Sequence, residues 1–324
     1  MMFERFIKQG VLSEQQIQEA MDNTLIFDSC EEIDLNTDIK MPTIYPNLSP
    51  NERVNLLKKI INKKFSEIRK EEHIEGEKFK KYRDGIRYEM KIIEETNDVC
   101  HTADYFLLNT KLVDLGVNKY GGVLTRTGRG SCGSFYINRI LGMTQIDRFN
   151  INLPLYPDRF MSSARLIENR ALPDIDFNVK SQAEFVAASR ELLGENMCYP
   201  MIAYGTMQLG EAFRNVCRSH KLQYDEYNEI AKNIESYSDD PKWKPLIEEA
   251  NKYVGTIISA SVHPCAHVLS NKDLTEEYGV VRVGENICVM ITSGEADFWK
   301  VLKNDYLVVK VWKLISETFD MIGK

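Results

Sequence analysis

This sequence of 324 residues lacks several features of secreted and membrane proteins. No stretch approaches the roughly 18 consecutive apolar residues of a membrane span. The first residues, 1–8, contain no basic segment followed by an apolar one, as a secretion signal would. The seven cysteines are scattered, odd in number and form no C-x-x-C pair. These absences argue against a disulfide-stapled secreted protein, and we expect a cytoplasmic protein with reduced thiols and no membrane contact.

The sequence also lacks the two common nucleotide-binding motifs, G-x-x-x-x-G-K-[ST] and G-x-G-x-x-G, and any internal repeat. With 43% hydrophobic and 27% charged residues, it is typical of a globular protein of about two domains. The net charge of −7 argues mildly against nucleic-acid binding. Residues 52–91 are nevertheless basic, so they could bind a phosphate backbone, or they could be solvated helices with internal ion pairs.

The pattern of apolar residues predicts an α+β protein. Residues 36–51 contain three prolines and are expected to be an extended connector. Ser13 and Ser49 are expected to cap the helices that follow them, and the second helix has Pro50 in its first turn. Further helices are predicted at about 78–97, 103–116, 135–141, 182–194, 207–220, 224–236 and 243–254, and strands at 257–262, 266–269, 280–283, 287–291 and 306–311. A helical block at 181–255 therefore interrupts a mixed sheet.

An acidic pair stands on a short apolar run that Pro173 opens. In a β-strand, Asp174 and Asp176 would share one face, while Ile175 and Phe177 would point into a core. Two carboxylates on one face repel each other unless a cation lies between them, and Mg²⁺ prefers such oxygen ligands. A solvated strand edge with two acids is the alternative for this motif alone.

Two more segments are candidates for phosphate binding. Residues 128–134 are rich in glycine and serine, so backbone N–H groups, Arg129 and the hydroxyls of Ser131 and Ser134 could hold an anion, aided by the helix that starts near Ser134. A tight turn before a helix is the alternative. Near the end of the chain, Lys303 and Asp305 share one face of a predicted strand, as a phosphate ligand and a third metal-binding carboxylate or as an exposed ion pair.

The succession of these motifs resembles a known family. In order they are Tyr105-Phe-Leu-Leu, Gly128-Arg-Gly-Ser, Ile146-Asp, Asp158-Arg-Phe, Pro173-Asp-Ile-Asp, Tyr204-Gly-Thr-Met, His263-Pro-Cys-Ala-His-Val and Leu302-Lys-Asn-Asp-Tyr-Leu. Their order and spacing over about residues 20–320 resemble the bacterial and phage C-family DNA polymerases, the DNA polymerase III alpha subunits.

The resemblance implies roles for particular residues. Asp174, Asp176 and Asp305 would be the three catalytic carboxylates of the palm and would hold two Mg²⁺ ions, with Mn²⁺ as an alternative. The residues expected to bind the phosphates of the dNTP are Arg129, Gly130, Ser131, Ser134, Arg170 and Lys303. In the helical block, Arg214, Arg218 and Lys221 would contact the DNA backbone or pair within the block.

His263, Cys265 and His267 suggest a zinc site, but the sequence offers no fourth ligand nearby. Since His263 matches a palm position of the family, we interpret it as structural or as part of the active site.

The resemblance also implies a domain organisation. Residues 1–35 would be the end of an N-terminal phosphoesterase-like domain or a linker. Residues 36–180 and 256–324 would form a palm like that of polymerase β, with a mixed sheet and helices. Residues 181–255 would be the helical thumb, and the fingers would be absent.

The expected function is template-directed DNA synthesis, in which primer–template DNA and dNTP are the partners. The alternative is one half of a split polymerase, inactive alone, that binds DNA or a fingers-bearing chain and reaches a sliding clamp through that chain.

Overall fold

The computed structural model describes residues 2–30, 36–126 and 129–323, and the chain forms two compact units, residues 1–37 and 38–324. The first unit contains helices α1 (Met2–Gln9) and α2 (Glu14–Asn23), followed by a 3₁₀ turn at Thr24–Ser29. The predicted cap of α2 is confirmed, because the Ser13 hydroxyl accepts the backbone N–H of Gln16 and the Gln16 side chain accepts that of Ser13. Ile17 is the buried residue of α2.

The described part of the second unit contains a six-stranded mixed sheet with the strand order β1-β6-β3-β2-β5-β4. Its strands are β1 (Ile175–Val179), β2 (Cys198–Thr206), β3 (Ile257–Leu269), β4 (Val280–Val283), β5 (Asn286–Val289) and β6 (Leu302–Val308). β1 and β6 are parallel, as are β2 and β5, while the other neighbouring pairs are antiparallel. The predicted α+β class is therefore confirmed.

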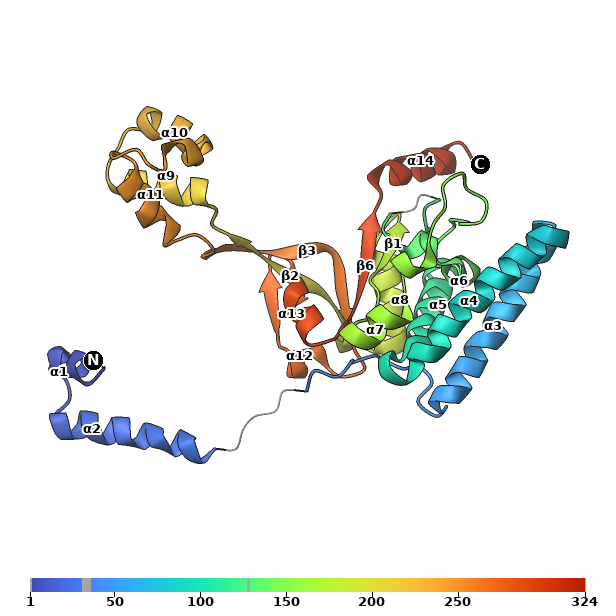
Figure 1. Ribbon diagram of the computed structural model, residues 1–324, viewed down its shortest axis with the longest axis horizontal. Helices are drawn as coiled ribbons and strands as arrows, with labels where there is room; N and C mark the ends of the chain where they lie inside the picture. The colour runs from blue at the N-terminus through green and yellow to red at the C-terminus, as the bar shows by residue number, and fades with distance from the viewer. Residues whose placement is uncertain (1, 31–35, 127–128, 324) are drawn as a thin grey trace. The chain divides into compact units, whose positions relative to one another are not determined.

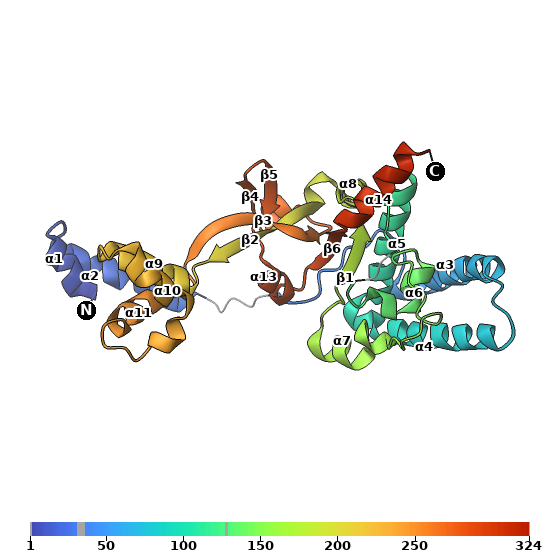
Figure 2. The same ribbon diagram turned by 90° about the horizontal axis from the view of Figure 1, so that it is seen from above.

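Helices on one side of β1 and β6 build the largest core (Figures 1 and 2). They are α3 (Pro50–Glu71), α4 (Gly76–Cys100), α5 (Thr102–Asn118), α6 (Tyr136–Ile140), α7 (Ser163–Asn169) and α8 (Ala183–Leu193). Tyr306 of β6 is buried between the rings of Phe177 and Phe185, at centroid distances of 5.7 and 6.0 Å. The predicted cap of α3 is also confirmed, with a capping box between Ser49 and Glu52 and Pro50 in the first turn.

The basic segment lies on α3 and α4, where several of its cations have acidic partners. Lys58 pairs with Glu94 at 2.8 Å, Lys64 with Asp114 at 3.1 Å, and Lys91 with Glu95 at 3.5 Å. These pairs favour solvated, ion-paired helices in this segment.

The helical block predicted at 181–255 contains a strand that was not predicted. Residues 198–206 form β2, which pairs with β3, and α8 packs against α5 and on the sheet. The helical insertion is therefore shorter. It contains α9 (Leu209–Ser219), α10 (Tyr224–Lys232) and α11 (Lys244–Asn251) (Figure 1). These helices enclose a separate core around Phe213 and Trp243.

Three further α-helices belong to the described fold: α12 (Leu274–Glu277), α13 (Ser293–Phe298) and α14 (Lys310–Met321). The last strand was predicted at 306–311 but begins earlier, at Leu302, and ends at Val308. Within the described residues, we find no helix with the length and apolar character needed to cross a membrane.

Candidate active site

The sheet brings the acidic residues together at β1 and β6. These strands are parallel, and their register sets Asp176 opposite Asp305. Ile175 and Phe177 are fully buried, as predicted for the opposite face of β1. Asp174 lies just before β1 and is exposed, while Asp176 and Asp305 are half-buried. Since paired residues of neighbouring strands point to the same side, Asp176 and Asp305 carry their carboxylates on one face.

The environment of these acids disfavours their charge. Desolvation raises the pKa of Asp176, and the carboxylates of Asp305 and Asp174 raise it further, against the opposing effect of Arg129. Desolvation also raises the pKa of Asp174, although Lys303 opposes it. A cation between the carboxylates would relieve both effects, because it favours their charged form.

Lys303 connects Asp174 to a further acid. Its Nζ lies 3.5 Å from Oδ1 of Asp174 and 3.2 Å from Oδ1 of Asp297 on α13, and its side chain is only 11% exposed. Burial lowers the pKa of Lys303, but the two carboxylates outweigh it and the pKa is raised. The sequence did not identify Asp297, because its place depends on how α13 packs against β6.

The glycine-serine loop touches the acids at one point. Gly130 has φ +77°, and a Cβ atom there would lie 1.6 Å from Oδ2 of Asp176, so the backbone approaches the carboxylate closely. Arg129 is exposed, and its charge acts on the Asp176 carboxyl. Ser134 is turned inward, where its N–H and hydroxyl donate to the Ser131 carbonyl at 3.0 and 2.7 Å. Gly128, the first residue of the predicted motif, lies outside the described residues.

The expected contribution of the helix start to anion binding was wrong. The first helical N–H groups, of Tyr136 and Ile137, donate to the two carboxylate oxygens of Glu89 at 2.9 and 2.8 Å. Glu89 is fully buried and pairs with Arg148 at 2.7 Å. Burial raises the pKa of Glu89 to about 7, although Arg148 and the two N–H groups lower it. This internal carboxylate therefore occupies the place that a phosphate would need.

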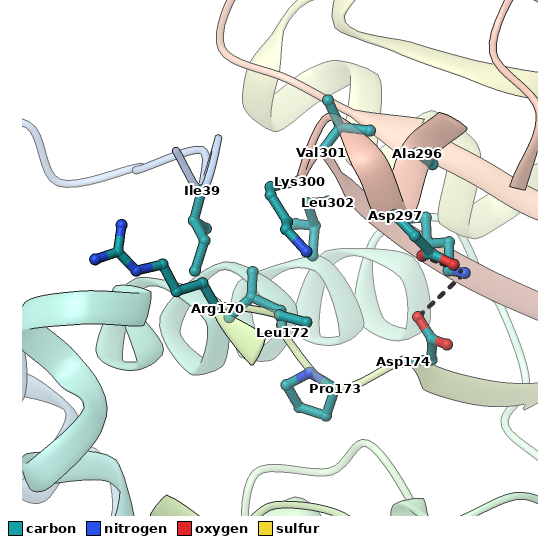
Figure 3. Close-up of a pocket in the computed structure, with 12 residues that line it drawn as sticks. Ile39, Arg170, Leu172, Pro173, Asp174, Ala296, Asp297, Lys300, Val301 and Leu302 are labelled. Atoms are coloured by element: carbon teal, nitrogen blue, oxygen red, sulfur yellow. Dashed lines mark hydrogen bonds and ion pairs between the residues drawn. The ribbon is translucent and has the colours of Figure 1, made fainter. Parts of the chain in front are cut away.

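A cavity of about 40 Å³ lies beside the acids, between residues 170–174 and the segment from α13 to β6 (Figure 3). Arg170 lines it, but its guanidinium points away from Asp174. Its backbone, at φ +45°, ends α7 in the left-handed conformation. Lys300 lines the same cavity, and its Nζ donates to the Asn169 carbonyl at 3.3 Å. The structure thus brings Lys303, rather than Arg170, to the carboxylates.

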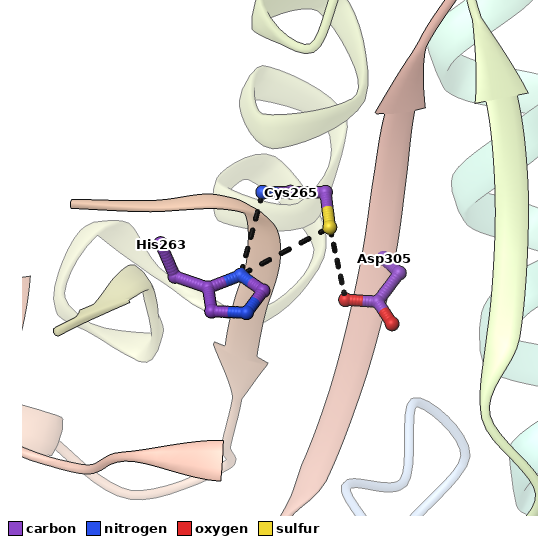
Figure 4. A group of neighbouring side chains, drawn as sticks. All are labelled: His263, Cys265 and Asp305. Carbon is purple, nitrogen blue, oxygen red and sulfur yellow. Dashed lines mark hydrogen bonds between the residues drawn. The ribbon is translucent and has the colours of Figure 1, made fainter. Parts of the chain in front are cut away.

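The two histidines and the cysteine of β3 lie in two different environments. Sγ of Cys265 lies 3.6 Å from Oδ1 of Asp305 and 3.9 Å from Nδ1 of His263 (Figure 4). His267 instead is buried against the ring of Tyr306, at a centroid distance of 5.4 Å, and burial lowers its pKa to about 4. The residue that joins His263 and Cys265 is therefore Asp305 of β6, which no local sequence pattern could indicate.

The basic residues of the helical insertion make local hydrogen bonds. Arg214 donates to the Gly210 carbonyl at 3.2 Å and to the Asn228 amide oxygen at 3.4 Å. Arg218 donates to the Asn215 amide oxygen at 2.6 Å, and Lys221 is exposed with φ +59°. Their contact with DNA stays a prediction.

The sequence of this chain matches a known family and several curated proteins. A family model described as the bacterial DNA polymerase III alpha NTPase domain matches residues 55–308. The DNA polymerase III subunit alpha of Mycobacterium tuberculosis (strain CDC 1551 / Oshkosh) is 23% identical over 279 residues, which cover 74% of this chain and 22% of that protein. The subunit of Bacillus subtilis (strain 168) is 24% identical, with coverages of 77% and 23%, and that of Escherichia coli (strain K12) is 22% identical, with 68% and 20%.

The chain thus spans about a fifth to a quarter of the length of these curated relatives. The family match nevertheless extends over far more than half of the 324 residues and includes Asp174, Asp176, Lys303 and Asp305. The chain belongs to the bacterial DNA polymerase III alpha NTPase domain family.

Proposed function

We propose that this chain is the palm and thumb portion of a C-family DNA polymerase and that it catalyses template-directed transfer of a nucleotide from dNTP to a primer 3′-hydroxyl. The observation that carries the proposal is the in-register pair of Asp176 and Asp305 on parallel strands. Asp174 and Lys303 stand beside that pair, and the Gly130 backbone contacts it. The mixed sheet would be a palm like that of polymerase β, and its thumb would be residues 207–256 rather than 181–255.

The three carboxylates fit two Mg²⁺ ions. They supply hard oxygen donors, and desolvation and the neighbouring acids raise the pKa values of Asp174 and Asp176, an effect that a bound cation would offset. Asp174, Asp176 and Asp305 would therefore hold the metal. When bound, two such ions activate an attacking hydroxyl and neutralise the charge that develops on the phosphates.

The neighbouring residues have roles that follow from their positions. Lys303, held between two carboxylates, would keep its charge and orient the triphosphate. Arg129 and the Gly130 N–H would approach the same phosphates from the loop, together with Ser131. Ser134 would act through the loop, because its hydroxyl already binds the Ser131 carbonyl. Arg170 would contribute only after a change of side-chain conformation.

The proposed thumb would bind the primer–template duplex. Its exposed Arg218 and Lys221 would contact DNA phosphates, and Arg214 would support that surface through its bonds to Asn228 and Gly210. Removal of such a contact would weaken binding to all DNA sequences about equally and reduce its salt dependence.

Primer extension tests the proposal directly. The 324-residue chain is given a labelled primer–template and dNTPs with Mg²⁺ and, separately, with Mn²⁺. The variants are Asp174→Asn and Asp305→Asn, with Asp239→Asn as the matched control, because Asp239 is an exposed acid of the helical insertion. Metal-dependent extension by the wild type and the control, but by neither site variant, is the expected result. Thermal unfolding of each protein confirms that it is folded.

The alternative is a module that binds DNA or a polymerase chain without turnover. A folded wild-type chain that binds primer–template but extends it with neither ion would refute catalysis by this chain and favour that alternative. Gel-shift and extension assays on the same samples separate the two outcomes.

A further inference from the structure

The strand β3 is irregular beside the catalytic acids. Pro200 of β2 pairs with His267 and Ile202 pairs with Val262, so the register shifts and β3 has extra residues between these pairs. A bulge of this kind redirects side chains, and bulges are frequent next to active sites. Here it turns His263 and Cys265 toward Asp305 of the neighbouring strand β6 (Figure 4).

The three side chains have the spacing of metal ligands. One ligand atom from each of His263, Cys265 and Asp305 lies within 4.8 Å of the others, and all three residues are half-buried. Two distances between the ligand atoms, Sγ to Oδ1 at 3.6 Å and Sγ to Nδ1 at 3.9 Å, are close to those between the ligands of a tetrahedral metal ion. Zinc bonds of about 2.0–2.3 Å set tetrahedral ligands roughly 3.4–3.6 Å apart. Shifts of a few tenths of an ångström would bring Sγ to these distances from the other two ligand atoms.

The hydrogen bonds of the trio suit a cation. Nδ1 of His263 accepts the Ala266 N–H at 2.9 Å, so this nitrogen is unprotonated, as a metal ligand must be. The thiol of Cys265 donates its proton to Asp305. A bound cation would take the place of that proton, which would pass to solvent. Nδ1 of His263 would then bind the cation instead of accepting the Ala266 N–H.

We propose that His263, Cys265 and Asp305 bind a thiophilic divalent cation, Zn²⁺ or Cd²⁺, and that this binding withdraws Asp305 from the Mg²⁺ site. Thiolate and imidazole ligands select zinc-like ions, whereas Mg²⁺ requires oxygen ligands. Three protein ligands leave a fourth position to water. The consequence for Asp305 rests on the proposed function, but the binding of the cation does not. Zinc would thereby act as an inhibitor of the catalytic centre.

Cobalt titration tests the cation site without any reliance on activity. Co²⁺ is added to the reduced full-length chain, and the near-ultraviolet charge-transfer absorption of a thiolate–cobalt bond is followed. The wild type is expected to bind one equivalent with this band. Cys265→Ser is expected to lose the band and to bind at least about tenfold more weakly. Cys30→Ser is the matched control, because Cys30 is an exposed cysteine of the first unit. A band that persists in Cys265→Ser would overturn the proposal, as would equal Co²⁺ affinity of that variant and the wild type.

A second measurement protects the test against a variant that fails to fold. Wild-type protein is alkylated with iodoacetamide with and without Zn²⁺, and the modification of Cys265 is followed by mass spectrometry. Zn²⁺ is expected to slow alkylation of Cys265 and to leave that of Cys30 unchanged. Equal slowing at both cysteines, or at neither, contradicts the proposed site.

Competition separates this proposal from the proposed function. Zn²⁺ is expected to lower Mn²⁺ binding, measured by electron paramagnetic resonance, more in the wild type than in Cys265→Ser, each relative to its own zinc-free binding. If the chain binds no Mn²⁺, the proposed function fails and the cobalt band still decides the thiol site. If the band is absent but extension proceeds, only the thiol site fails.

Discussion

Replacement of Asp305 by asparagine is expected to stabilise the metal-free chain at neutral pH. Asp176 and Asp305 are paired across neighbouring strands, which lie about 4.8 Å apart. Desolvation and the Asp305 charge both raise the pKa of Asp176, so the folded state carries an unfavourable interaction between two carboxylates. Asparagine removes one charge and keeps an oxygen that can accept the Cys265 thiol proton. The two carboxylates therefore destabilise the folded chain when no cation is bound.

The size of this cost follows from Coulomb's law. Two unit charges about 5 Å apart repel each other by roughly 3 kcal/mol at an effective dielectric constant of about 20 and by about 1 kcal/mol in bulk water. Both carboxylates are half-buried, so solvent screens them, and Arg129 offsets part of the repulsion. We expect Asp305→Asn to raise the free energy of unfolding by about 1 kcal/mol, which corresponds to about 2 °C in Tm.

Thermal unfolding with a chelator at pH 7 and at pH 4 is the assay. The pKa of Asp176 is raised in the folded state, so its destabilising effect is present above that pKa and disappears as the carboxyl takes up a proton in acid. The advantage of Asp305→Asn should therefore shrink as the pH falls. Saturating Mg²⁺ should reverse the order, because a ligand at about 100 times its Kd stabilises the wild type by about 2.7 kcal/mol.

Three outcomes would refute this reasoning. The variant could be less stable than the wild type without metal, its advantage could persist unchanged at pH 4, or the control Asp239→Asn could show the same gain. Any of these would mean that Asp176 and Asp305 do not repel each other in the folded chain.

Three further expectations concern the surroundings of the acids. Glu89→Ala should lower the free energy of unfolding in urea by about 3–5 kcal/mol, because it leaves a buried arginine unpaired, while the exposed Glu94→Ala on the same helix should cost no more than about 1 kcal/mol. Gly130→Ala should weaken Mn²⁺ binding at least about tenfold, because a Cβ atom there would clash with the Asp176 carboxylate. Gly121→Ala is the control, because Gly121 has a similar φ but open space around it. That substitution brings the backbone strain without a clash and should leave Mn²⁺ binding unchanged. The affinity for Mn²⁺ should decrease as the pH is lowered, and the decrease should begin above the ordinary pKa range of aspartate, because desolvation and the neighbouring acids raise the pKa of Asp176. A constant affinity down to about pH 4 would contradict this.

Local sequence was sufficient for the features that depend on neighbouring residues. Ser13 and Ser49 cap helices as predicted, because a cap involves residues only two or three positions apart. The alternation around Asp176 correctly assigned Ile175 and Phe177 to the core, since side chains of a strand alternate between its two faces.

The strand β2 was missed because its sequence has no clear alternation. Cys198–Thr206 contains a proline and a glycine and carries a nearly continuous apolar run. A run of that kind fits a strand that is buried on both faces as well as a helix, so its pattern predicted neither element and the segment was included in the helical block. Only its pairing with β3 and β5 identifies it as part of the sheet.

The surroundings of the acids depend on contacts between distant segments. Glu89 on α4 reaches the first turn of α6, Asp297 on α13 reaches Lys303, and Cys265 on β3 reaches Asp305. The spacing of residues in the sequence does not encode such contacts. The sequence therefore predicted an anion site at the start of α6, although the Glu89 carboxylate already occupies that position.

The acids could be proposed from the sequence, but the groups that offset their negative charge could not. The reason lies in the pairing of β1 with β6. Parallel neighbouring strands need a long crossover, and here the whole of residues 177–304 lies between Asp176 and Asp305. That length of chain includes both Lys303 at the start of β6, which compensates Asp174, and Cys265 of β3, which donates to Asp305. One carboxylate of the group is therefore paired with a cation and another with a thiol proton. In the proposed metal site, the fold that supplies the hard carboxylate ligands thus places one soft ligand within reach of them, and we expect metal selectivity there to depend on the bulge of β3 as much as on the acids.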